Sequence, residues 1–226
     1  MSSKRESSIV LIPAHNEASA ISYVLDRTLP LGIPVLVVAN GCSDNTAFLA
    51  SKAGASVLEL DESGYSLAIR AGYEWALSRN VKYVAQIDAD FQHPPVYIPR
   101  LLSYLDEVDW VIGSREGTGS KGGAPRRLSS FLLHRWTKYR HNVTLRDPCS
   151  GMWGLNVKAM RVFSDLFPLN VMEANVRIEA LRRGLQLREI AVPMMCRTSG
   201  ASMHDGFKGV YHFTKSILEL EHLRKS

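Results

Sequence analysis

The sequence predicts an α/β protein in which helices flank a mostly parallel, Rossmann-like central sheet. Short apolar segments alternate with amphipathic ones through residues 8–113, and this alternation is typical of a doubly wound sheet. Polar residues directly follow several of the apolar segments, at the strand ends where open α/β sheets bind ligands. The chain has 226 residues, enough for one sizeable core, so we expect a single domain spanning residues 1–226.

Buried strands are predicted in the first half of the chain, because apolar and β-branched residues gather there in short runs. These strands cover residues 8–12, 34–38, 55–60, 81–87 and 109–113. Helices are predicted between them, where apolar residues recur at helical spacing, over residues 21–29, 47–52, 66–78 and 97–106. No Gly-x-Gly-x-x-Gly follows the first strand, which argues against a dinucleotide site.

The second half of the chain is less regular. Residues 116–123 contain four glycines, which predicts a mobile loop. A basic helix is predicted at residues 126–141, a further helix at residues 172–183 and a strand at residues 187–195. Residues 207–224 predict a final amphipathic helix, for which packing on the sheet is favoured over contact with a membrane or a partner.

Composition argues against several classes of protein. Apolar residues make up 46% and charged residues 22% of the chain, as in ordinary soluble domains. No apolar run approaches about 18 residues and the N-terminus is polar, so we expect neither a transmembrane helix nor a secretory signal. The three cysteines are widely spaced and match neither a zinc site nor a disulfide framework, so we expect a cytoplasmic protein.

Positive charge is concentrated in one segment. The net charge is +5, and residues 115–146 carry eight basic residues against one acidic residue, Glu116. Such a segment predicts an anionic partner, which could be phosphate, anionic lipid or nucleic acid. A solvated basic helix face explains the same composition equally well.

Two aspartates directly follow the strand predicted at residues 81–87. Asp88 and Asp90 are one residue apart, and Pro94 and Pro95 then stop regular structure. Carboxylates this close repel each other and favour a cation beside them, and hard oxygen ligands suit Mg²⁺ or Mn²⁺. A bare Asp-x-Asp is equally typical of a solvated acidic turn, so its position after a strand is what favours a metal site.

Seven segments in a fixed order resemble glycosyltransferase family two, whose members have the GT-A fold. The resemblance spans about residues 8–203 and is greatest to the dolichyl- and polyprenyl-phosphate sugar (mannose or glucose) synthases. Each segment alone is weakly specific, whereas the seven in order are specific. They are residues 10–17 (VLIPAHNE), 40–46 (NGCSDNT), 88–95 (DADFQHPP), 112–115 (IGSR), 126–130 (RRLSS), 146–151 (RDPCSG) and 197–202 (RTSGAS).

The resemblance implies a nucleotide-sugar-binding half, residues 1–114, and an acceptor-binding half, residues 115–226. It implies that a divalent metal on the donor diphosphate is held by Asp88, Asp90 and Gln92, with Asp90 catalytic. The residues implied to line the donor pocket are Pro13, Ala14, Glu17, Asn40, Asp44, Asp88 and Ala89. Those implied to bind the acceptor phosphate are Arg115, Arg126, Ser130 and Arg197, and the planar guanidinium suits phosphate oxygens.

The chain departs from the family pattern in two places. Ala39 and Asn40 stand where relatives usually have two aspartates that help to read the nucleoside, so the donor base, in GDP or UDP, stays open. The sequence also predicts no C-terminal membrane segment, and the resemblance implies that relatives without one rely on a membrane-anchored partner subunit or on surface contact. We therefore expect a peripheral protein on the cytoplasmic membrane face.

Arg70, on a predicted helix, is a further candidate for binding the donor phosphates. The alternative interpretation is that Arg70 is a surface residue without a role in binding.

The resemblance implies an inverting, metal-dependent transfer of a sugar from a nucleotide-sugar donor to a polyprenyl or dolichyl phosphate. A phosphate acceptor is already anionic near neutral pH and needs positioning rather than a base. Transfer to a hydroxyl of a saccharide, metabolite or protein is the alternative. It requires a carboxylate base, for which Asp147 and Glu173 are the candidates. A purely structural role is the alternative interpretation of each of these two acids. A non-catalytic nucleotide- or nucleic-acid-binding module is a third reading. Intact Asp88 and Asp90 argue against it, and we do not expect nucleic acid as a partner.

Overall fold

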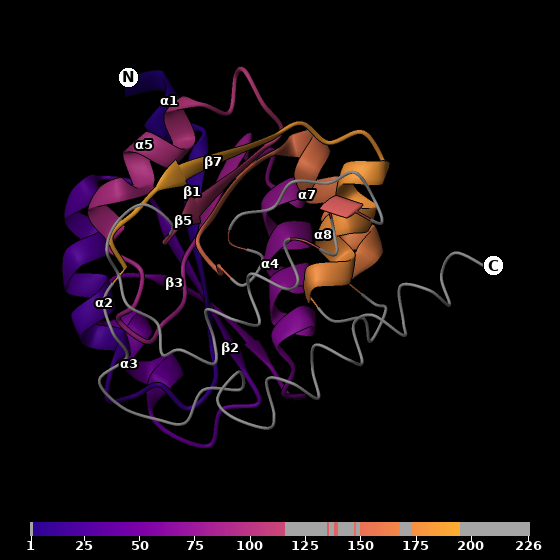
Figure 1. The fold of residues 1–226 in the computed structure, drawn as a ribbon. Helices are drawn as coiled ribbons and strands as arrows, with labels where there is room; N and C mark the ends of the chain where they lie inside the picture. Colours follow the sequence, from indigo (N-terminus) through magenta and orange to yellow (C-terminus); the bar gives the residue numbers. More distant parts are fainter. Residues whose placement is uncertain are drawn as a thin grey trace.

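The computed structural model describes residues 2–115, 135, 138–139, 147, 150–167 and 173–194. In this part of the chain, helices cover both faces of a seven-stranded sheet (Figure 1). The order of the strands across the sheet is β3-β2-β1-β4-β6-β5-β7. Their bounds are Ser8–Ala14 (β1), Val35–Asn40 (β2), Ser56–Leu60 (β3), Tyr83–Gln86 (β4), Trp110–Ser114 (β5), Trp153–Asn156 (β6) and Leu187–Ala191 (β7).

The sheet is mostly parallel, as the sequence predicts. β1 pairs in parallel with β2 and β4, β2 pairs in parallel with β3, and β5 pairs in parallel with β7. β6 is the exception, since it runs antiparallel between β4 and β5. Its register sets Trp153 beside Gln86 on one side and beside Ile112 on the other. The chain that enters β6 therefore reaches the carboxyl ends of both neighbouring strands.

Two groups of helices cover the two faces (Figure 1). One face carries α2 (Ile21–Thr28), α3 (Thr46–Lys52) and α5 (Ile98–Ser103). The opposite face carries α4 (Tyr65–Ser78), α7 (Val157–Leu166) and α8 (Glu173–Arg182). The described part also contains the short helix α1 (Ser2–Glu6) and the 3-10 turns η1 (Leu29–Leu31) and η2 (Pro95–Tyr97).

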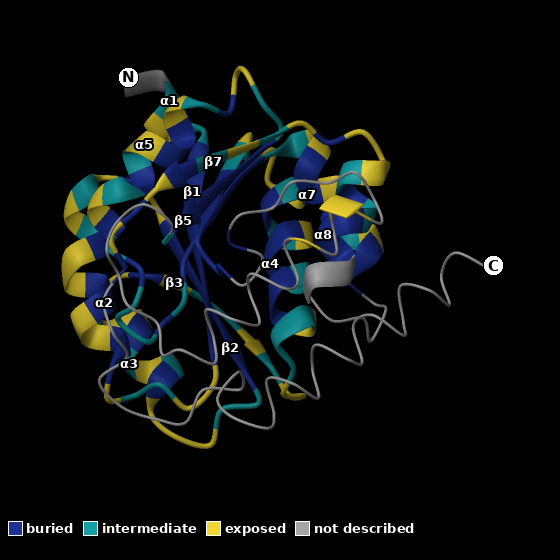
Figure 2. Ribbon diagram, in the orientation of Figure 1, coloured by how far each residue is buried: buried dark blue, intermediate teal, exposed yellow. Residues whose placement is uncertain are grey.

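Side chains alternate between the two faces along β1. Val10 and Ile12 belong to the apolar cluster beneath α2 and α5, whereas Ile9 and Leu11 belong to the cluster beneath α4 and α7. Every residue of β1 is buried. Strands covered on both faces read as continuous apolar runs rather than as alternating ones, which is the pattern in this sequence. Figure 2 shows the buried sheet between helices whose outer sides are exposed.

All five strands predicted in the first half of the chain form, and two other predictions need correction. The helix predicted at residues 97–106 starts as the 3-10 turn η2 and ends at Ser103. The strand predicted at residues 187–195 ends at Ala191, because Pro193 follows and has no N–H to donate to the sheet.

Two elements of the second half are not predicted from the sequence. β6 has only four residues, and α7 follows it at once, with the side chain of Asn156 accepting a hydrogen bond from Ala159 N at 3.0 Å. The glycine-rich loop at residues 116–123 and the helix predicted at residues 207–224 lie outside the described residues, as does most of the predicted basic helix. In the described part, no helix is long and apolar enough to cross a membrane.

Candidate active site

The carboxyl ends of β1, β2 and β4 meet at one edge of the sheet. Because β1 pairs in parallel with both neighbours, Ala14 lies beside Ala39 of β2, and Leu11 lies beside Gln86 of β4. The polar segments predicted to bind the donor leave the strands at this edge, starting at Asn40 and at Asp88. Open α/β sheets bind their ligands at this position.

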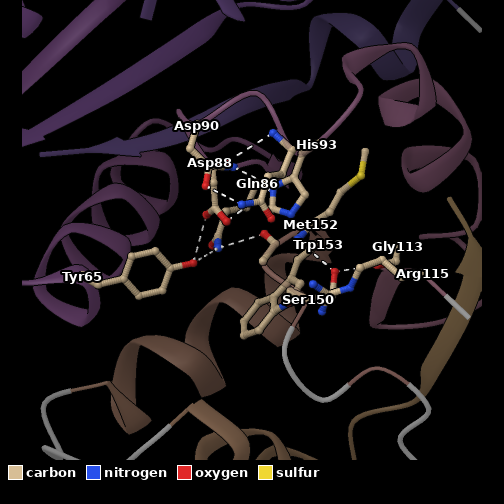
Figure 3. Close-up of polar contacts among 12 residues, drawn as sticks. Tyr65, Gln86, Asp88, Asp90, His93, Gly113, Arg115, Ser150, Met152 and Trp153 are labelled. Carbon is tan, nitrogen blue, oxygen red and sulfur yellow. Dashed lines mark hydrogen bonds and ion pairs between the residues drawn. The ribbon is translucent and has the colours of Figure 1, made fainter. Parts of the chain in front are cut away.

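Asp88 lies among the polar contacts drawn in Figure 3. Its Oδ1 accepts a hydrogen bond from the Tyr65 hydroxyl at 3.3 Å, and its N–H donates to Nδ1 of His93 at 2.9 Å. His93 Nδ1 also lies 3.5 Å from Asp88 Oδ2. Burial, and next the charge of Asp90, raise the pKa of Asp88 to about 7.

Asp90 and Gln92 form a compact turn after Asp88. Gln92 donates to both carboxylate oxygens of Asp90, from its backbone N at 3.2 Å and from its Nε2 at 3.0 Å. Phe91 between them has a φ of 68°, in the left-handed region that is uncommon for residues other than glycine. Its ring packs edge-on against Tyr23 of α2, with ring centroids 4.6 Å apart, and this contact ties the turn to α2.

The oxygen atoms of this turn fit a divalent cation. Asp88 and Asp90 offer carboxylate oxygens and Gln92 offers an amide oxygen, which are the hard ligands that Mg²⁺ and Mn²⁺ prefer. Burial, and next the charge of Asp90, raise the pKa of Asp88, and a cation beside the two carboxylates would favour the ionised form. Within the described residues no cluster of three His, Cys, Asp or Glu side chains could hold a metal, so water or substrate oxygens would complete the shell.

Asn40 joins three elements at the edge of the sheet. Its side chain is buried; Nδ2 donates to the carbonyl oxygen of Ala14 at 2.8 Å, and Oδ1 accepts from the N–H of Gly64 at 2.9 Å. Both ends of the amide therefore bind backbone groups, one at the end of β1 and one at the start of α4. The Asn40 carbonyl oxygen also lies 2.7 Å from Nδ1 of His15.

Asp44 ties the loop after β2 to the loop after β1. Its carboxylate accepts hydrogen bonds from Thr46 N and from Ala18 N, both at 3.0 Å. Burial alone would raise the pKa of Asp44, but these bonds and that from the Thr46 hydroxyl together outweigh it and lower the pKa below its ordinary value. The Thr46 hydroxyl in turn accepts from Glu17 N at 2.8 Å, so the two donor-side loops are held as one unit.

Arg115 and Asp147 form a buried, two-pronged ion pair at the end of β5. Asp147 Oδ2 accepts from Arg115 Nε at 2.7 Å and from its backbone N at 3.0 Å, and Oδ1 accepts from Nη2. The Asp147 side chain is only 5% exposed. Burial alone would raise the pKa of Asp147, but the bonds and charge of Arg115 prevail and lower it. A carboxylate held in this way is a weak base.

Residues 150–153 connect the end of β5 to the Asp88 side of the site (Figure 3). Gly113 N donates to the Met152 carbonyl at 2.9 Å, and the Ser150 carbonyl accepts from Trp153 Nε1 at 2.6 Å. The same Ser150 carbonyl accepts from Nη2 of Arg177, a fully buried residue of α8, at 2.8 Å. Gly151 is thereby pressed against Asp88, so close that a Cβ atom at this position would lie 2.6 Å from Asp88 Oδ2.

The comparison with protein families identifies the chain. Residues 9–163 match the model of Glycosyl transferase family 2, which is more than half of the sequence. The chain belongs to glycosyl transferase family 2. The mostly parallel sheet flanked by helices is the fold of the GT-A glycosyltransferases, as the sequence predicts.

Relatives of this glycosyltransferase match along most of its length. It is 28% identical to the dolichyl-phosphate hexose transferase of Haloferax volcanii over 93% of this chain and 92% of the relative. It is 26% identical to the undecaprenyl-phosphate mannosyltransferase of Micrococcus luteus over 88% of this chain and 87% of the relative. Its fold is similar to glucosyl-3-phosphoglycerate synthase of Mycobacterium tuberculosis, solved with Mn²⁺ and UDP-glucose. The TM-score is 0.69 at 18% identity, over 99% of this chain and 82% of that one.

The structure brings most of the implied donor residues of the glycosyltransferase to one edge of the sheet. These are Pro13, Ala14, Glu17, Asn40, Asp44, Asp88 and Ala89. Arg70 lies on α4, where its Nε donates to Glu74 at 2.8 Å in an exposed ion pair, and its part in donor binding stays a prediction. Glu173 begins α8, but its side chain lies outside the described part, as do Arg126, Ser130 and Arg197.

Four residues that contact the candidate site are given no role from the sequence, although Gly151 lies in one of the seven matching segments. Tyr65, Gly151 and Arg177 contact the site only because the sheet order brings distant segments together. Gln86 carries a signal that could have been used, since it is a polar residue in an otherwise apolar buried strand. A fully buried amide requires hydrogen-bond partners, and such a position in a strand predicts a polar network.

Proposed function

We propose that this family 2 glycosyltransferase moves a hexose from a nucleotide sugar to a polyprenyl or dolichyl phosphate, with inversion at the anomeric carbon. The observation that carries the proposal is the pairing of Asp147 with Arg115. A hydroxyl acceptor needs a carboxylate that can take its proton, and Asp147 has a lowered pKa and three donors on its oxygens. A phosphate acceptor is already anionic and has no such requirement.

On the donor side, we propose that Asp88, Asp90 and Gln92 hold Mg²⁺ or Mn²⁺ against the diphosphate. The cation supplies neutralisation of the charge that develops on the leaving diphosphate. Asp90 is oriented for this role by the two bonds from Gln92, and Asp88 is oriented by Tyr65. The loops joined by Asp44 and Thr46 line the side on which the nucleoside would bind. The Mn²⁺ and UDP-glucose complex of the M. tuberculosis synthase supports this donor class.

On the acceptor side, we propose that the lipid phosphate is positioned by arginines for attack in line with the leaving diphosphate. Arg115 is one of them; its Nε and Nη2 are oriented by Asp147, which fixes the direction of the guanidinium plane. Arg126, Ser130 and Arg197 remain proposed partners outside the described residues. Two relatives that match over most of their length are named for dolichyl and undecaprenyl phosphate, which supports the lipid acceptor. With such a lipid acceptor, the transfer would take place at a membrane surface.

A transfer assay tests this function. Purified protein is incubated with Mn²⁺ or Mg²⁺, a short-chain polyprenyl phosphate and radiolabelled GDP- or UDP-hexoses in turn, and label is measured in the organic extract. We expect labelled lipid from one donor, loss of the product when the metal is chelated, and loss in Asp90→Asn. Asp26→Asn, which changes an exposed acid on α2, is the matched control and should retain activity. No labelled lipid with any donor would overturn the proposal.

A further inference from the structure

Gln86 is a polar side chain in the middle of the sheet. It closes β4 two positions before Asp88 and is fully buried. A buried amide without partners is strongly unfavourable, and Gln86 has three. Its Oε1 accepts from the Tyr73 hydroxyl at 2.6 Å, and its Nε2 donates to the Tyr65 hydroxyl at 3.2 Å and to the Gly151 carbonyl at 3.3 Å.

The partners of Gln86 fix the direction of every hydrogen bond in this set. The Gly151 carbonyl can only accept, so the nitrogen of the amide must face it and the oxygen must face Tyr73. The second hydrogen of Nε2 then points to the oxygen of Tyr65. Since that oxygen already accepts a bond from Gln86, the Tyr65 hydrogen is directed to Asp88 Oδ1, 3.3 Å away. The set therefore delivers one O–H donor to a carboxylate of the acidic turn (Figure 3).

Tyr65 is itself held from a second side. It is the first residue of α4, directly after Gly64, whose N–H donates to the buried Asn40 side chain. The ring therefore starts from an anchored backbone position and projects toward Asp88 and Gln86 (Figure 3). A donor to the carboxylate favours the charged form of Asp88 and restricts its rotation, so that the remaining lone pairs keep one direction.

We infer that Tyr65, oriented by Gln86, is a positioning residue that presets the Asp88 carboxylate for the donor metal. The inference rests on the proposed function, because it takes Asp88 as a metal ligand. Side chains that hydrogen-bond to a metal-ligating residue commonly contribute about 10–100-fold to metal affinity, because they hold the ligating atoms in their binding orientation. Tyr65 and Gln86 would do so from two elements, α4 and β4, that meet only in the folded sheet.

The test is Mn²⁺ affinity rather than turnover. Melting temperatures are measured at one fixed pH with saturating UDP or GDP, and the Mn²⁺ concentration that gives half of the metal-dependent shift is determined. Tyr65→Phe keeps the ring and removes only the hydroxyl, so we expect a metal-free melting temperature close to wild type and about ten-fold weaker Mn²⁺ affinity. Tyr83→Phe, which removes a hydroxyl bonded to Asp106 at the other end of β4, is the matched control and should bind Mn²⁺ like the wild type.

A double-mutant cycle tests whether Gln86 acts through Tyr65. Gln86→Met keeps the length of the side chain and removes its hydrogen bonds, so we expect it to weaken Mn²⁺ binding too. In the Tyr65→Phe background, Gln86→Met should weaken Mn²⁺ affinity by less than about a further two-fold, because both substitutions break the same hydrogen-bond chain from Gln86 through Tyr65 to Asp88. If wild type shows Mn²⁺-dependent stabilisation that Asp88→Asn abolishes, and Tyr65→Phe binds Mn²⁺ like wild type, the inference alone is wrong. If wild type shows no Mn²⁺-dependent stabilisation with either nucleotide, the proposed metal site is wrong and the inference fails with it.

Discussion

The backbone of Gly151 lies directly against the carboxylate of Asp88. A Cβ atom added at Gly151 would lie 2.6 Å from Asp88 Oδ2 and 2.9 Å from Oδ1, closer than real Cβ contacts come. Asp88 follows β4 and Gly151 precedes the neighbouring antiparallel strand β6, so both lie at the same edge of the sheet. The absence of a side chain at residue 151 is therefore what allows Asp88 its observed position.

Gly151→Ala should displace the Asp88 carboxylate and weaken the metal site. We expect at least about ten-fold weaker Mn²⁺ affinity in the thermal-shift titration, since ligand orientation commonly has this effect. Gly154→Ala is the matched control, because a Cβ there meets Leu101 at an ordinary 3.4 Å and lies on β6, away from Asp88. Equal Mn²⁺ affinity in the two variants would contradict this account of Gly151.

Asp88→Asn should make the metal-free protein more stable at alkaline pH. The pKa of Asp88 is raised to about 7, above that of an unfolded carboxyl, so the unfolded chain releases its proton first. Stability conferred by this group is therefore lost as pH rises toward about 7, and the loss is complete above that value. The variant lacks this loss. Urea unfolding across pH should show an advantage for Asp88→Asn above neutrality that disappears in acid; a pH-independent difference would contradict it.

Removing one partner of the Arg115–Asp147 pair should strongly destabilise the protein. Arg115→Met leaves the Asp147 carboxylate, 5% exposed, without its counter-charge, and we expect a loss of about 3 kcal/mol in the free energy of unfolding. Glu107→Gln, which breaks an exposed pair with Arg188, is the control and should change it by less than about 1 kcal/mol. Urea unfolding at neutral pH distinguishes them. Similar small losses of unfolding free energy in the two variants would mean that the buried pair contributes no more to stability than the exposed one.

Asn40→Asp, which restores one acid of the usual family pattern, should destabilise this chain. The Asn40 Nδ2 donates to the Ala14 carbonyl. The carboxylate of an aspartate has no hydrogen to donate, so its oxygen and the Ala14 carbonyl oxygen would be two facing acceptors in a buried position. We expect a loss of about 1–3 kcal/mol, as for a buried acceptor without a donor, and weaker nucleotide binding. Asn45→Asp, an exposed change in the same loop, should be nearly neutral. A stable Asn40→Asp variant with tighter nucleotide binding would refute this.

The sequence predicts the first half of the fold well, because each strand there is an apolar run between clear turn signals. β1 and β2 are buried on both faces and carry no competing pattern. β6 escapes prediction because it has four residues, includes Gly154 and takes its strand geometry from pairing with β4 and β5. α7 follows without a loop, so no turn residues announce it.

The site divides in the same way. Asp88 and Asp90 are predicted as metal ligands because they are one residue apart in the sequence and follow a strand. The roles of Tyr65, Gln86 and Gly151 depend on which strands are neighbours, and this information is absent from any one segment. For Asp147 the sequence suggests a role that the structure does not favour. Its position in the sequence makes it a candidate base, whereas the contact with Arg115 makes its carboxylate weakly basic.

The most direct test of the central claim compares two acceptors that differ only in the phosphate. Purified protein, Mn²⁺ and the active labelled nucleotide sugar are incubated with a polyprenyl phosphate or with the corresponding polyprenol, and the initial rate of lipid labelling is measured. The account predicts labelling of the phosphate that depends on Mn²⁺ and is lost in Asp90→Asn, with no labelling of the alcohol. Labelling of the alcohol at a similar rate, or of neither lipid, would contradict it.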